Sequence, residues 1–200
     1  KGLVDPFGGR EDITKRLIRC VGEPSLRFEE DALRILRSLR FMSRLGFRLD
    51  DETAKALRQN AFRLKTISRE RIFSELSGII CGKNACDTVT EYADVISVAL
   101  PELFAGGAFM LKRLPDELHL RFAALFKNAD DAENGMFSLK SPRKLRERVV
   151  ALRRLIPLPD DEKEILILGI DTPPETLREA AYWNSTGKTA DIIDRLRMQN

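Results

Sequence analysis

Apolar residues recur at helical spacing along most of the chain, and polar residues fill the positions between them. The clearest example follows Ser68, a residue type that favours the N-cap of a helix, with Ile67 before it in position for a hydrophobic staple. Behind Ser68, one apolar stripe repeats at the spacing of a helix with a single buried face: Ile72, Phe73, Leu76, Ile79 and Ile80. The pattern predicts a helix that begins directly after Ser68.

The same analysis divides the rest of the chain into helices with short connections. Asp12 is a good N-cap for the first stripe, and Gly46 is placed to end the second helix. The predicted helices cover residues 13–21, 28–45, 50–61, 84–96, 116–128, 142–156, 161–168, 173–184 and 188–198. The fold class is therefore predicted to be all-α, with a boundary near Pro101 and Gly106, where the pattern is interrupted.

The composition limits the class of protein. Of the 200 residues, 43% are hydrophobic, which is enough for a core, and no apolar run approaches the roughly 20 residues that span a bilayer. The net charge of +3 excludes a strongly basic tail of the histone type. Three cysteines and no signal peptide predict a reducing, cytoplasmic setting without a membrane. Because Cys81 and Cys86 have no second pair and His119 is the one histidine, no metal site is predicted.

The segment over residues 29–44 carries the most informative arrangement of charges. On a helical wheel, its arginines gather on one face and its apolar residues gather on the opposite face. The arginines are Arg34, Arg37, Arg40 and Arg44, and Asp31 lies one turn before the first of them. A row of like charges is mildly unfavourable by itself, but it is useful where an anionic ligand lies along the helix.

Asp31 and Arg34 together offer a way to recognise a nucleobase. A carboxylate accepts hydrogen bonds and a guanidinium donates them in a planar fork, so the two can imitate the Watson–Crick edge of a base. Further arginines on the same face can bind the phosphates of the nucleotide. The same spacing is also typical of an ordinary salt bridge within a helix, with solvated arginines beside it.

Five motifs in order along residues 1–80 resemble those of one family. They are 5–13 (DPFGGREDI), 18–22 (IRCVG), 27–37 (RFEEDALRILR), 40–41 (RF) and 67–72 (ISRERI). Their order and spacing resemble those of the bacterial-type (class II) tRNA nucleotidyltransferases, the CCA-adding enzymes, and of the related bacterial poly(A) polymerases. The resemblance is specific over residues 1–80 and loose over the rest of the chain.

The resemblance implies a multi-helix neck, body and tail arrangement behind a catalytic head. It assigns residues 1–12 to a remnant of the head and the hinge loop, residues 13–100 to the neck, and residues 101–200 to the body and tail. The hinge residues are Asp5, Gly8, Gly9 and Asp12. Glycine suits a hinge because it accepts positive φ and large backbone changes, although an ordinary tight turn has the same pattern.

The resemblance also assigns the nucleotide site. Asp31 and Arg34 match the amino-acid template that pairs with the base of CTP or ATP, and Arg37 and Arg40 match positions that contact the same nucleotide. The residues that support the template helix match the last neck motif: Ser68, Glu70 and Arg71. The family's Asp-x-Asp pair, which binds Mg²⁺, lies in the head and has no counterpart in this sequence. No catalytic residue is therefore predicted here, and we expect the missing head domain to be required for transfer.

A second basic cluster follows in the C-terminal half of the chain. Basic residues gather between residues 140 and 154, where Glu147 is the one acidic residue: Lys140, Arg143, Lys144, Arg146, Arg148, Arg153 and Arg154. A protein that holds tRNA by its acceptor stem and elbow contacts mainly phosphates and shape. The first five residues of the cluster are therefore predicted to bind RNA, although a solvated helix face explains the same pattern.

The function predicted by these motifs is the nucleotide-selecting and tRNA-binding part of a CCA-adding tRNA nucleotidyltransferase, which adds C, C and A to the tRNA 3′ end. A bacterial poly(A) polymerase, or a relative that adds only A or only CC, fits the same motifs. The alternative from another class is a non-catalytic helical RNA-binding module. The motifs do not decide among these alternatives or define the oligomeric state.

Overall fold

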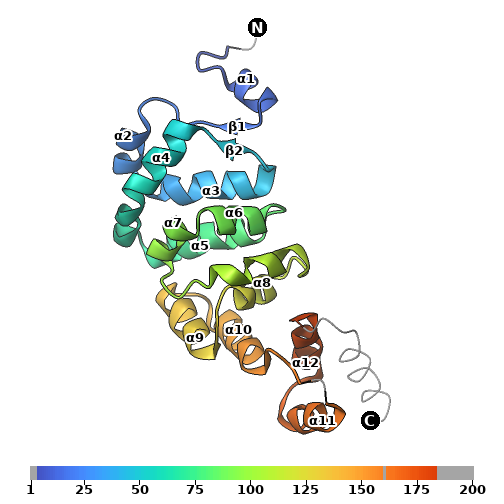
Figure 1. The fold of residues 1–200 in the computed structure, drawn as a ribbon. Helices are drawn as coiled ribbons and strands as arrows, with labels where there is room; N and C mark the ends of the chain where they lie inside the picture. The colour runs from blue at the N-terminus through green and yellow to red at the C-terminus, as the bar shows by residue number, and fades with distance from the viewer. Residues whose placement is uncertain (1–3, 160, 184–200) are drawn as a thin grey trace.

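The computed structural model describes residues 4–159 and 161–183, and nearly all of their regular structure is helical. The helices pack into one elongated body, with α1 at one end and α11 and α12 at the other (Figure 1). The prediction of an all-α fold is confirmed. The exception within the described residues is a single pair of short strands near α1.

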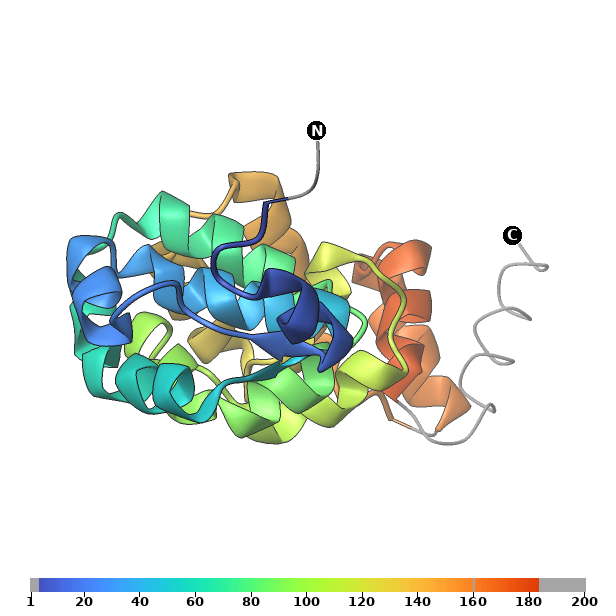
Figure 2. The ribbon, with the colours of Figure 1, turned by 90° about the horizontal axis from the view of Figure 1, so that it is seen from above.

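The first elements of the chain form a small cap on one end of the body. Helix α1 spans Gly9–Thr14 and strand β1 spans Leu17–Ile18. Strand β1 pairs in parallel with strand β2, Arg48–Leu49, which comes about thirty residues later. Seen from above, α1 lies over the rest of the body (Figure 2).

The predicted helix over residues 13–21 is wrong, because the chain leaves α1 for a strand. Asp12 lies inside α1 and is not its N-cap, since Gly8 precedes the helix. The apolar stripe has a different cause: Leu17 and Leu49 are buried where the two strands meet. A short apolar run does not by itself distinguish a strand from a helix, and here a distant segment decides.

Two helices occupy the segment that periodicity predicted as one helix over 28–45. Helix α2 spans Pro24–Glu30 and helix α3 spans Leu33–Leu45. The chain breaks at Asp31, whose φ of −150° and ψ of 99° are extended. Gly46 ends α3 with a φ of 67°, as its position predicted. The break escaped prediction because apolar residues continue at helical spacing across it.

The following helices begin where local capping signals predicted. Helix α4 spans Asp51–Asn60, and Oδ2 of Asp50 accepts a hydrogen bond of 3.3 Å from the backbone N–H of Thr53. A 3₁₀-helix, η1, continues over Ala61–Thr66. The sequence pattern predicted a helix over 50–61, and the structure begins it at Asp51 with Asp50 as the N-cap.

Helix α5 spans Arg69–Ile80 and begins after Ser68, as predicted. Ile72 is fully buried and Ile67 packs against the same core, as the two residues of a staple are expected to do. Ser68 is the N-cap residue, as predicted, but its side chain makes no capping hydrogen bond with the described residues.

The predicted helix over 84–96 is also two helices. Helix α6 spans Ala85–Glu91 and helix α7 spans Ala93–Ala99, and they part at the buried Tyr92. A second 3₁₀-helix, η2, spans Ala105–Lys112 and packs against α6.

The C-terminal part adds a layer of short helices. Its elements are α8 (Leu118–Ala124), α9 (Ala129–Ser138), α10 (Arg143–Leu155), α11 (Glu162–Asp171), α12 (Pro174–Ala180) and η3 (Ala181–Trp183). Asn134 and Gly135 are typical of a turn, yet both lie inside α9, a helix that the pattern did not predict. A Cβ on Gly135 would lie 2.5 Å from the ring of Phe126, so packing and not a turn requires this glycine. The predicted helix over 188–198 lies outside the described residues.

Arg121, on α8, connects the end of α5 to the segment before α8. Its guanidinium is buried and donates hydrogen bonds to the carbonyl oxygens of Ile80 at 2.6 Å and Pro115 at 3.0 Å. A third bond of 3.3 Å reaches the carbonyl of Leu114, and Asp116 lies 3.5 Å away. A buried guanidinium is tolerated here because backbone acceptors and a carboxylate satisfy its donors.

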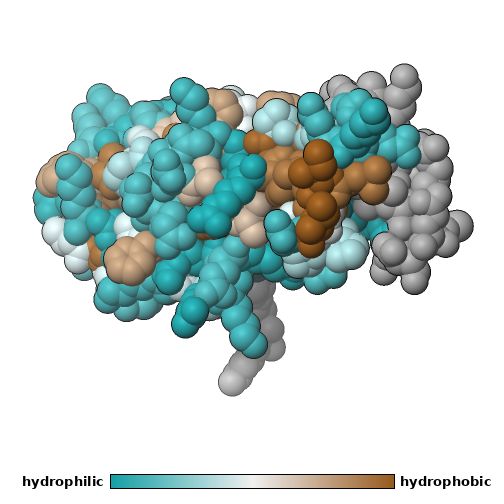
Figure 3. Space-filling view, turned by 90° about the horizontal axis from the view of Figure 1, so that it is seen from below, coloured by the Kyte–Doolittle hydropathy of each residue, from teal (hydrophilic) through white to brown (hydrophobic). Residues whose placement is uncertain are grey.

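Hydrophilic residues cover most of the face shown in Figure 3, with one larger apolar patch beside the residues drawn in grey. Exposed apolar side chains on α11 are Leu166, Ile167 and Ile170. Among the helices of the described residues, none combines the length and apolar character that crossing a bilayer requires.

Candidate nucleotide-binding site

Asp31 lies in the break between α2 and α3 and is held from two sides. Its Oδ1 accepts a hydrogen bond of 3.1 Å from the backbone N–H of Leu33, in the first turn of α3. The guanidinium of Arg71, on α5, lies 3.3 Å from Oδ2 and 3.4 Å from Oδ1. The Asp31 side chain is 27% exposed, so the protein orients the carboxylate without closing it off from a ligand.

Arg34 does not pair with the Asp31 carboxylate, although the backbone N–H of Arg34 donates to the Asp31 carbonyl at 3.0 Å. Its Nη1 lies instead 3.4 Å from Oε2 of Glu30, across the break. The prediction that Asp31 and Arg34 lie one turn apart on a continuous helix is therefore wrong. The alternative, an ordinary salt bridge between them, is wrong as well, and both side chains keep exposed surface.

Glu75, on α5, is shared by the two other predicted nucleotide-binding residues. Its Oε1 lies 3.5 Å from Nε of Arg37, and its Oε2 lies 2.8 Å from Nε of Arg40. The contact with Arg40 is purely electrostatic, since neither of its two atoms makes a hydrogen bond with the described residues. Glu75 is 9% exposed at its side chain, whereas Arg37 is exposed, so the carboxylate positions both guanidinium groups from within the protein.

Sequence reasoning missed Glu75, although one signal was present. Glu75 lies next to Leu76 and one turn after Ile72, on the apolar face of α5. An unpaired acid on a buried face is unfavourable, so its place predicts a basic partner on another element. The pattern does not say which of many arginines that partner is.

A groove continues from Arg40 between α3, α5 and the segment before α8, with a volume of about 410 Å³. Arg40, Arg44, Glu75, Cys81 and Asp116 line this α3–α5 groove. Burial, and then the nearby carboxylate of Asp116, raise the pKa of the Cys81 thiol to about 11. The thiol is therefore neutral at physiological pH. The positive charges that line the groove are the guanidinium groups of Arg40 and Arg44.

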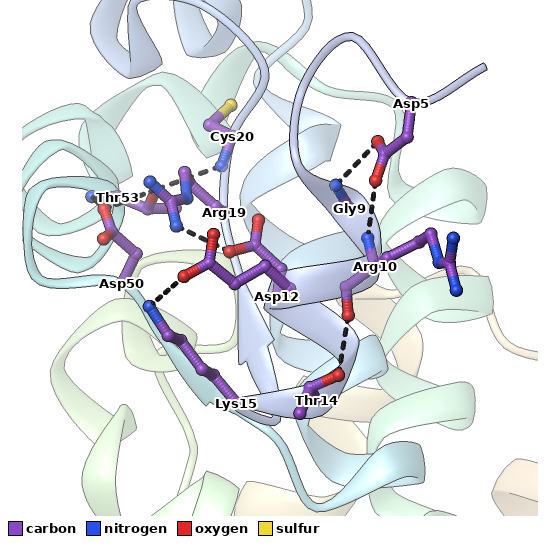
Figure 4. A network of polar contacts seen from close by, with 11 residues as sticks. Asp5, Gly9, Arg10, Asp12, Thr14, Lys15, Arg19, Cys20, Asp50 and Thr53 are labelled. Atoms are coloured by element: carbon purple, nitrogen blue, oxygen red, sulfur yellow. Dashed lines mark hydrogen bonds and ion pairs between the residues drawn. The ribbon is translucent and has the colours of Figure 1, made fainter.

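The predicted hinge loop is closed by the side chain of Asp5 (Figure 4). Its two carboxylate oxygens accept hydrogen bonds from the backbone N–H groups of Gly9 at 2.8 Å and Arg10 at 2.9 Å. These bonds lower the pKa of Asp5, the one from Arg10 most. Gly8 has a φ of 70°, in the left-handed region that favours glycine.

Asp12, the last predicted hinge residue, lies on α1 and faces the strand that follows. Its Oδ1 is 2.5 Å from Nη2 of Arg19 (Figure 4). Nearby, the backbone N–H of Cys20 donates to Oγ1 of Thr53 at 3.1 Å, which ties this segment to α4. The four residues therefore lie in one small polar region, and their action as a hinge stays a prediction.

The residues matched to the last neck motif lie at the start of α5 and face different neighbours. Arg71 contacts Asp31 directly, as support of the template requires. Glu70 lies 2.9 Å from Nζ of Lys140, in the turn between α9 and α10, and this pair lowers the pKa of Glu70. The Ser68 hydroxyl makes no capping bond among the described contacts.

The second basic cluster carries less excess charge in the fold than along the chain. The ion pairs are Lys140 with Glu70, Arg143 with Glu147, Arg146 with Glu133 and Arg148 with Glu179. Glu147 is therefore not the one opposing charge, because the fold brings three further acids from other elements. Lys144 is exposed and makes no ion pair within the described part of the chain.

Known sequences provide an independent comparison. Residues 46–103 match the family model described as the probable RNA and SrmB-binding site of polymerase A. The CCA-adding enzyme of Geobacillus thermodenitrificans is 45% identical over 109 residues, which are 54% of this chain and 27% of that protein. The CCA-adding enzyme of Limosilactobacillus reuteri is 33% identical over 167 residues, which are 78% of this chain and 40% of that protein. The chain thus spans less than half of the length of these relatives.

Solved structures extend the similarity to nearly the whole chain. The Bacillus stearothermophilus CCA-adding enzyme in complex with CTP has a TM-score of 0.76 at 28% identity, over 98% of this chain and 54% of that chain. The Thermotoga maritima CCA-adding enzyme complexed with tRNA has a TM-score of 0.71 at 20% identity, over 98% of this chain and 55% of that chain, and shows the shared fold. Over the length that it spans, the chain is therefore a relative of the CCA-adding enzymes, and its resemblance to the bacterial-type tRNA nucleotidyltransferases is confirmed.

Proposed function

We propose that the chain is the nucleotide-selecting and tRNA-binding part of a CCA-adding tRNA nucleotidyltransferase, which adds C, C and A to tRNA from CTP and ATP. One observation carries the proposal. The Asp31 carboxylate is oriented by Arg71 at the start of a helix whose open face presents Arg34, Arg37 and Arg40. The names of the relatives support the same assignment.

The chemistry of the two template residues suits the two bases of these substrates. Cytosine and adenine each present an amino donor beside a ring-nitrogen acceptor on their Watson–Crick edges. The Asp31 carboxylate accepts from the amino group, and the Arg34 guanidinium donates to the ring nitrogen. Uracil and guanine present a carbonyl and an N–H in those places, so the same pair leaves them with unmatched donors and acceptors.

Arg37 and Arg40 contact the same nucleotide from the positions in which Glu75 holds them. Guanidinium groups bind phosphate oxygens through paired charged hydrogen bonds, and a prepositioned arginine loses less freedom on binding. Mg²⁺ supplies charge neutralisation on the transferring phosphates. The described residues contain no group of three or more His, Cys, Asp or Glu side chains that could hold a metal, so a head domain would have to supply the ligands.

Base selection in the full-length enzyme that contains this chain tests the proposal. Asp31→Ala and Arg34→Ala should each lower the preference for CTP and ATP over UTP and GTP by roughly tenfold or more, because each removes a charged hydrogen bond to the base. Arg58→Ala is the matched control, since Arg58 pairs with Asp94 and stacks on Tyr92 elsewhere on the surface. Equal loss for all four nucleotides, with discrimination intact, contradicts the template role.

A second experiment tests the need for a head domain. The 200-residue chain, supplied with CTP, ATP, Mg²⁺ and tRNA that lacks its CCA end, should transfer no nucleotide, because two-metal transfer needs clamped carboxylates. Measured turnover by the chain alone would overturn this part of the proposal.

A bacterial poly(A) polymerase is the second candidate, and the description of the family model that matches residues 46–103 favours it. The two candidates predict different products of the full-length enzyme. A CCA-adding enzyme stops after three defined additions, whereas a poly(A) polymerase extends a long A tail. Sequencing of the extended RNA 3′ ends decides between them.

A further inference from the structure

Phe137, on α9, is an aromatic side chain that lies on the surface and not in the core. It is 67% exposed, even though the guanidinium of Arg146 lies 5.3 Å from the centre of its ring. Phe62 and Phe109 are exposed as well, so exposure alone does not single out Phe137. What distinguishes Phe137 is the basic cluster that begins three residues after it in the chain. A cation beside the ring marks the surface as one that combines an aromatic face with positive charge.

Lys140, three residues later, has an unusual backbone conformation. Helix α9 ends there in a left-handed turn, in which Lys140 has a φ of 51° and the N–H of Ser141 reaches the carbonyl of Met136 at 3.2 Å. Glycine is strongly preferred at this position because a Cβ is strained in that region, by about 1 kcal/mol. Lys140 keeps this conformation at that cost, and its ammonium group lies 2.9 Å from Oε1 of Glu70.

The same turn lies beside the candidate nucleotide site. Lys140 pairs with Glu70, Glu70 precedes Arg71 in α5, and Arg71 contacts the Asp31 carboxylate. The backbone N–H of Lys140 donates a hydrogen bond of 2.9 Å to the carbonyl oxygen of Phe137, so Phe137 belongs to the same turn. The start of α5 therefore contacts both the Asp31 carboxylate and the turn that carries Phe137.

We propose that the surface formed by Phe137, Lys140, Arg143, Lys144 and Arg146 binds the unpaired 3′ end of an RNA, with one base stacked on Phe137. The proposal rests on the proposed function and names the part of tRNA that this surface takes. Aromatic side chains stack on unpaired bases of any sequence, whereas the bases of an A-form duplex are already stacked on one another. The surrounding cations bind the phosphates of the single strand.

The acids near this surface do not oppose this role. Arg143 pairs with Glu147 at 2.7 Å and Arg146 pairs with Glu133 at 3.3 Å, and both glutamates are exposed. Exposed ion pairs contribute little, so a phosphate can replace a carboxylate as the partner of each arginine. Lys144 requires no such exchange, because it makes no ion pair within the described residues.

Two tRNA substrates and three variants of the full-length enzyme test the proposal. One tRNA carries its single-stranded 3′ end, and the other is trimmed to the end of the acceptor duplex. Phe137→Ala should raise the Kd of the tRNA with the single-stranded 3′ end about tenfold, which corresponds to one lost stacking contact. The Kd of the trimmed tRNA should stay unchanged. Phe137→Tyr should retain binding, and Phe109→Ala, which removes an equally exposed ring on η2, should have no effect.

Lys140→Gly separates binding from folding. It relieves the strained backbone, so the midpoint of urea unfolding should not fall, while the affinity for the untrimmed tRNA should decrease. If Phe137→Ala lowers the affinity for both tRNAs equally, the proposal is wrong and the surface contacts the duplex. If it lowers the affinity for neither tRNA, the proposal is wrong and the surface does not bind RNA. If base selection still depends on Asp31 in that case, the proposed function stands and the stacking surface alone is wrong.

Discussion

Helices α3 and α10 both have 13 residues and both carry arginines at helical spacing, yet the fold uses their charges differently. On α3, Arg37 and Arg40 converge on one buried carboxylate, that of Glu75. On α10, Arg143 and Arg146 pair with separate exposed acids, Glu147 and Glu133, which lie on different helices. The burial of the acid, and not the number of arginines, therefore decides whether a basic helix face is fixed in place.

The difference has a consequence for binding. A buried carboxylate cannot be exchanged for a ligand, so Arg37 and Arg40 are held in place for one small anionic molecule. An exposed carboxylate is easily replaced by phosphate, so Arg143 and Arg146 suit a long polyanion that binds in many slightly different ways. This difference agrees with the proposed roles of α3 in nucleotide binding and of α10 in RNA binding.

Removal of the buried acid should have the largest effect. Glu75→Gln leaves the Arg37 and Arg40 guanidinium groups without their counter-charge, and should lower the free energy of unfolding by about 2 kcal/mol. The loss stays below that of a fully buried pair because solvent reaches Arg37. Urea denaturation of the chain measures it.

The matched control is Glu147→Gln on α10, which should leave the unfolding midpoint unchanged because its pair with Arg143 is exposed. If both variants shift the midpoint equally, the proposed difference between the two helices is wrong.

The thiol of Cys81 reports on the α3–α5 groove. Its pKa of about 11 leaves little thiolate at pH 8, so we expect iodoacetamide to alkylate it about tenfold more slowly than an ordinary thiol, after allowance for the higher nucleophilicity of the more basic thiolate. Lys144→Cys places a comparison thiol on exposed α10. Mass spectrometry of the labelled peptides gives both rates, and equal rates would show that the groove is as well solvated as α10.

Gly78→Ala should disturb the nucleotide site through the side chain of Arg40. The new Cβ would lie 2.5 Å from Cδ of Arg40, so this arginine must move away from Glu75. We expect nucleotide affinity of the full-length enzyme to fall about fivefold, because a prepositioned charged contact is weakened. Gly169→Ala on α11 meets Leu177 at 3.6 Å, an ordinary contact, and should increase helix stability without affecting nucleotide binding.

The smallest effect is expected at Asp5, where backbone N–H groups and no arginine hold the carboxylate. The pKa of Asp5 is lower in the folded protein than its ordinary value of 3.8. The ionised carboxylate therefore contributes its full stabilisation above pH 3.8, and this stabilisation is lost as the pH falls through the lowered pKa. Asp5→Asn should therefore speed amide exchange at Gly9 and Arg10 at neutral pH and make no difference in strong acid. Hydrogen exchange followed by mass spectrometry measures the exchange rates. Equal rates in the wild type and in Asp5→Asn at neutral pH would show that the Asp5 carboxylate does not stabilise this loop.

Local features of the sequence predicted much of the fold. Gly46, Asp50 and Ser68 mark helix ends correctly because capping depends on residues within one turn. The arginine face of α3 was also predicted, since Ile35 and Leu36 on the opposite side are buried as their spacing requires.

Contacts between distant segments were not predictable in this way. The strand at Leu17 forms only because it pairs with β2. Gly135 in α9 is required because the ring of Phe126 leaves no room for a Cβ atom. The break at Asp31 is stabilised in part by Arg71, forty residues away. In each case the partner comes from another part of the chain, and periodicity carries no information about it.

The sequence by itself determined that the chain is helical, where most helices begin, and which arginines share the open face of α3. The motifs it carries also determined the family that it resembles. The tertiary structure alone decided that Asp31 leaves the helix, that Glu75 joins Arg37 to Arg40, and that Lys140 meets Glu70. The physical reason is the distance along the chain between interacting residues. Helix caps and apolar faces depend on residues within one helical turn. The partner of a charged side chain depends on which oppositely charged residue the packed core brings beside it.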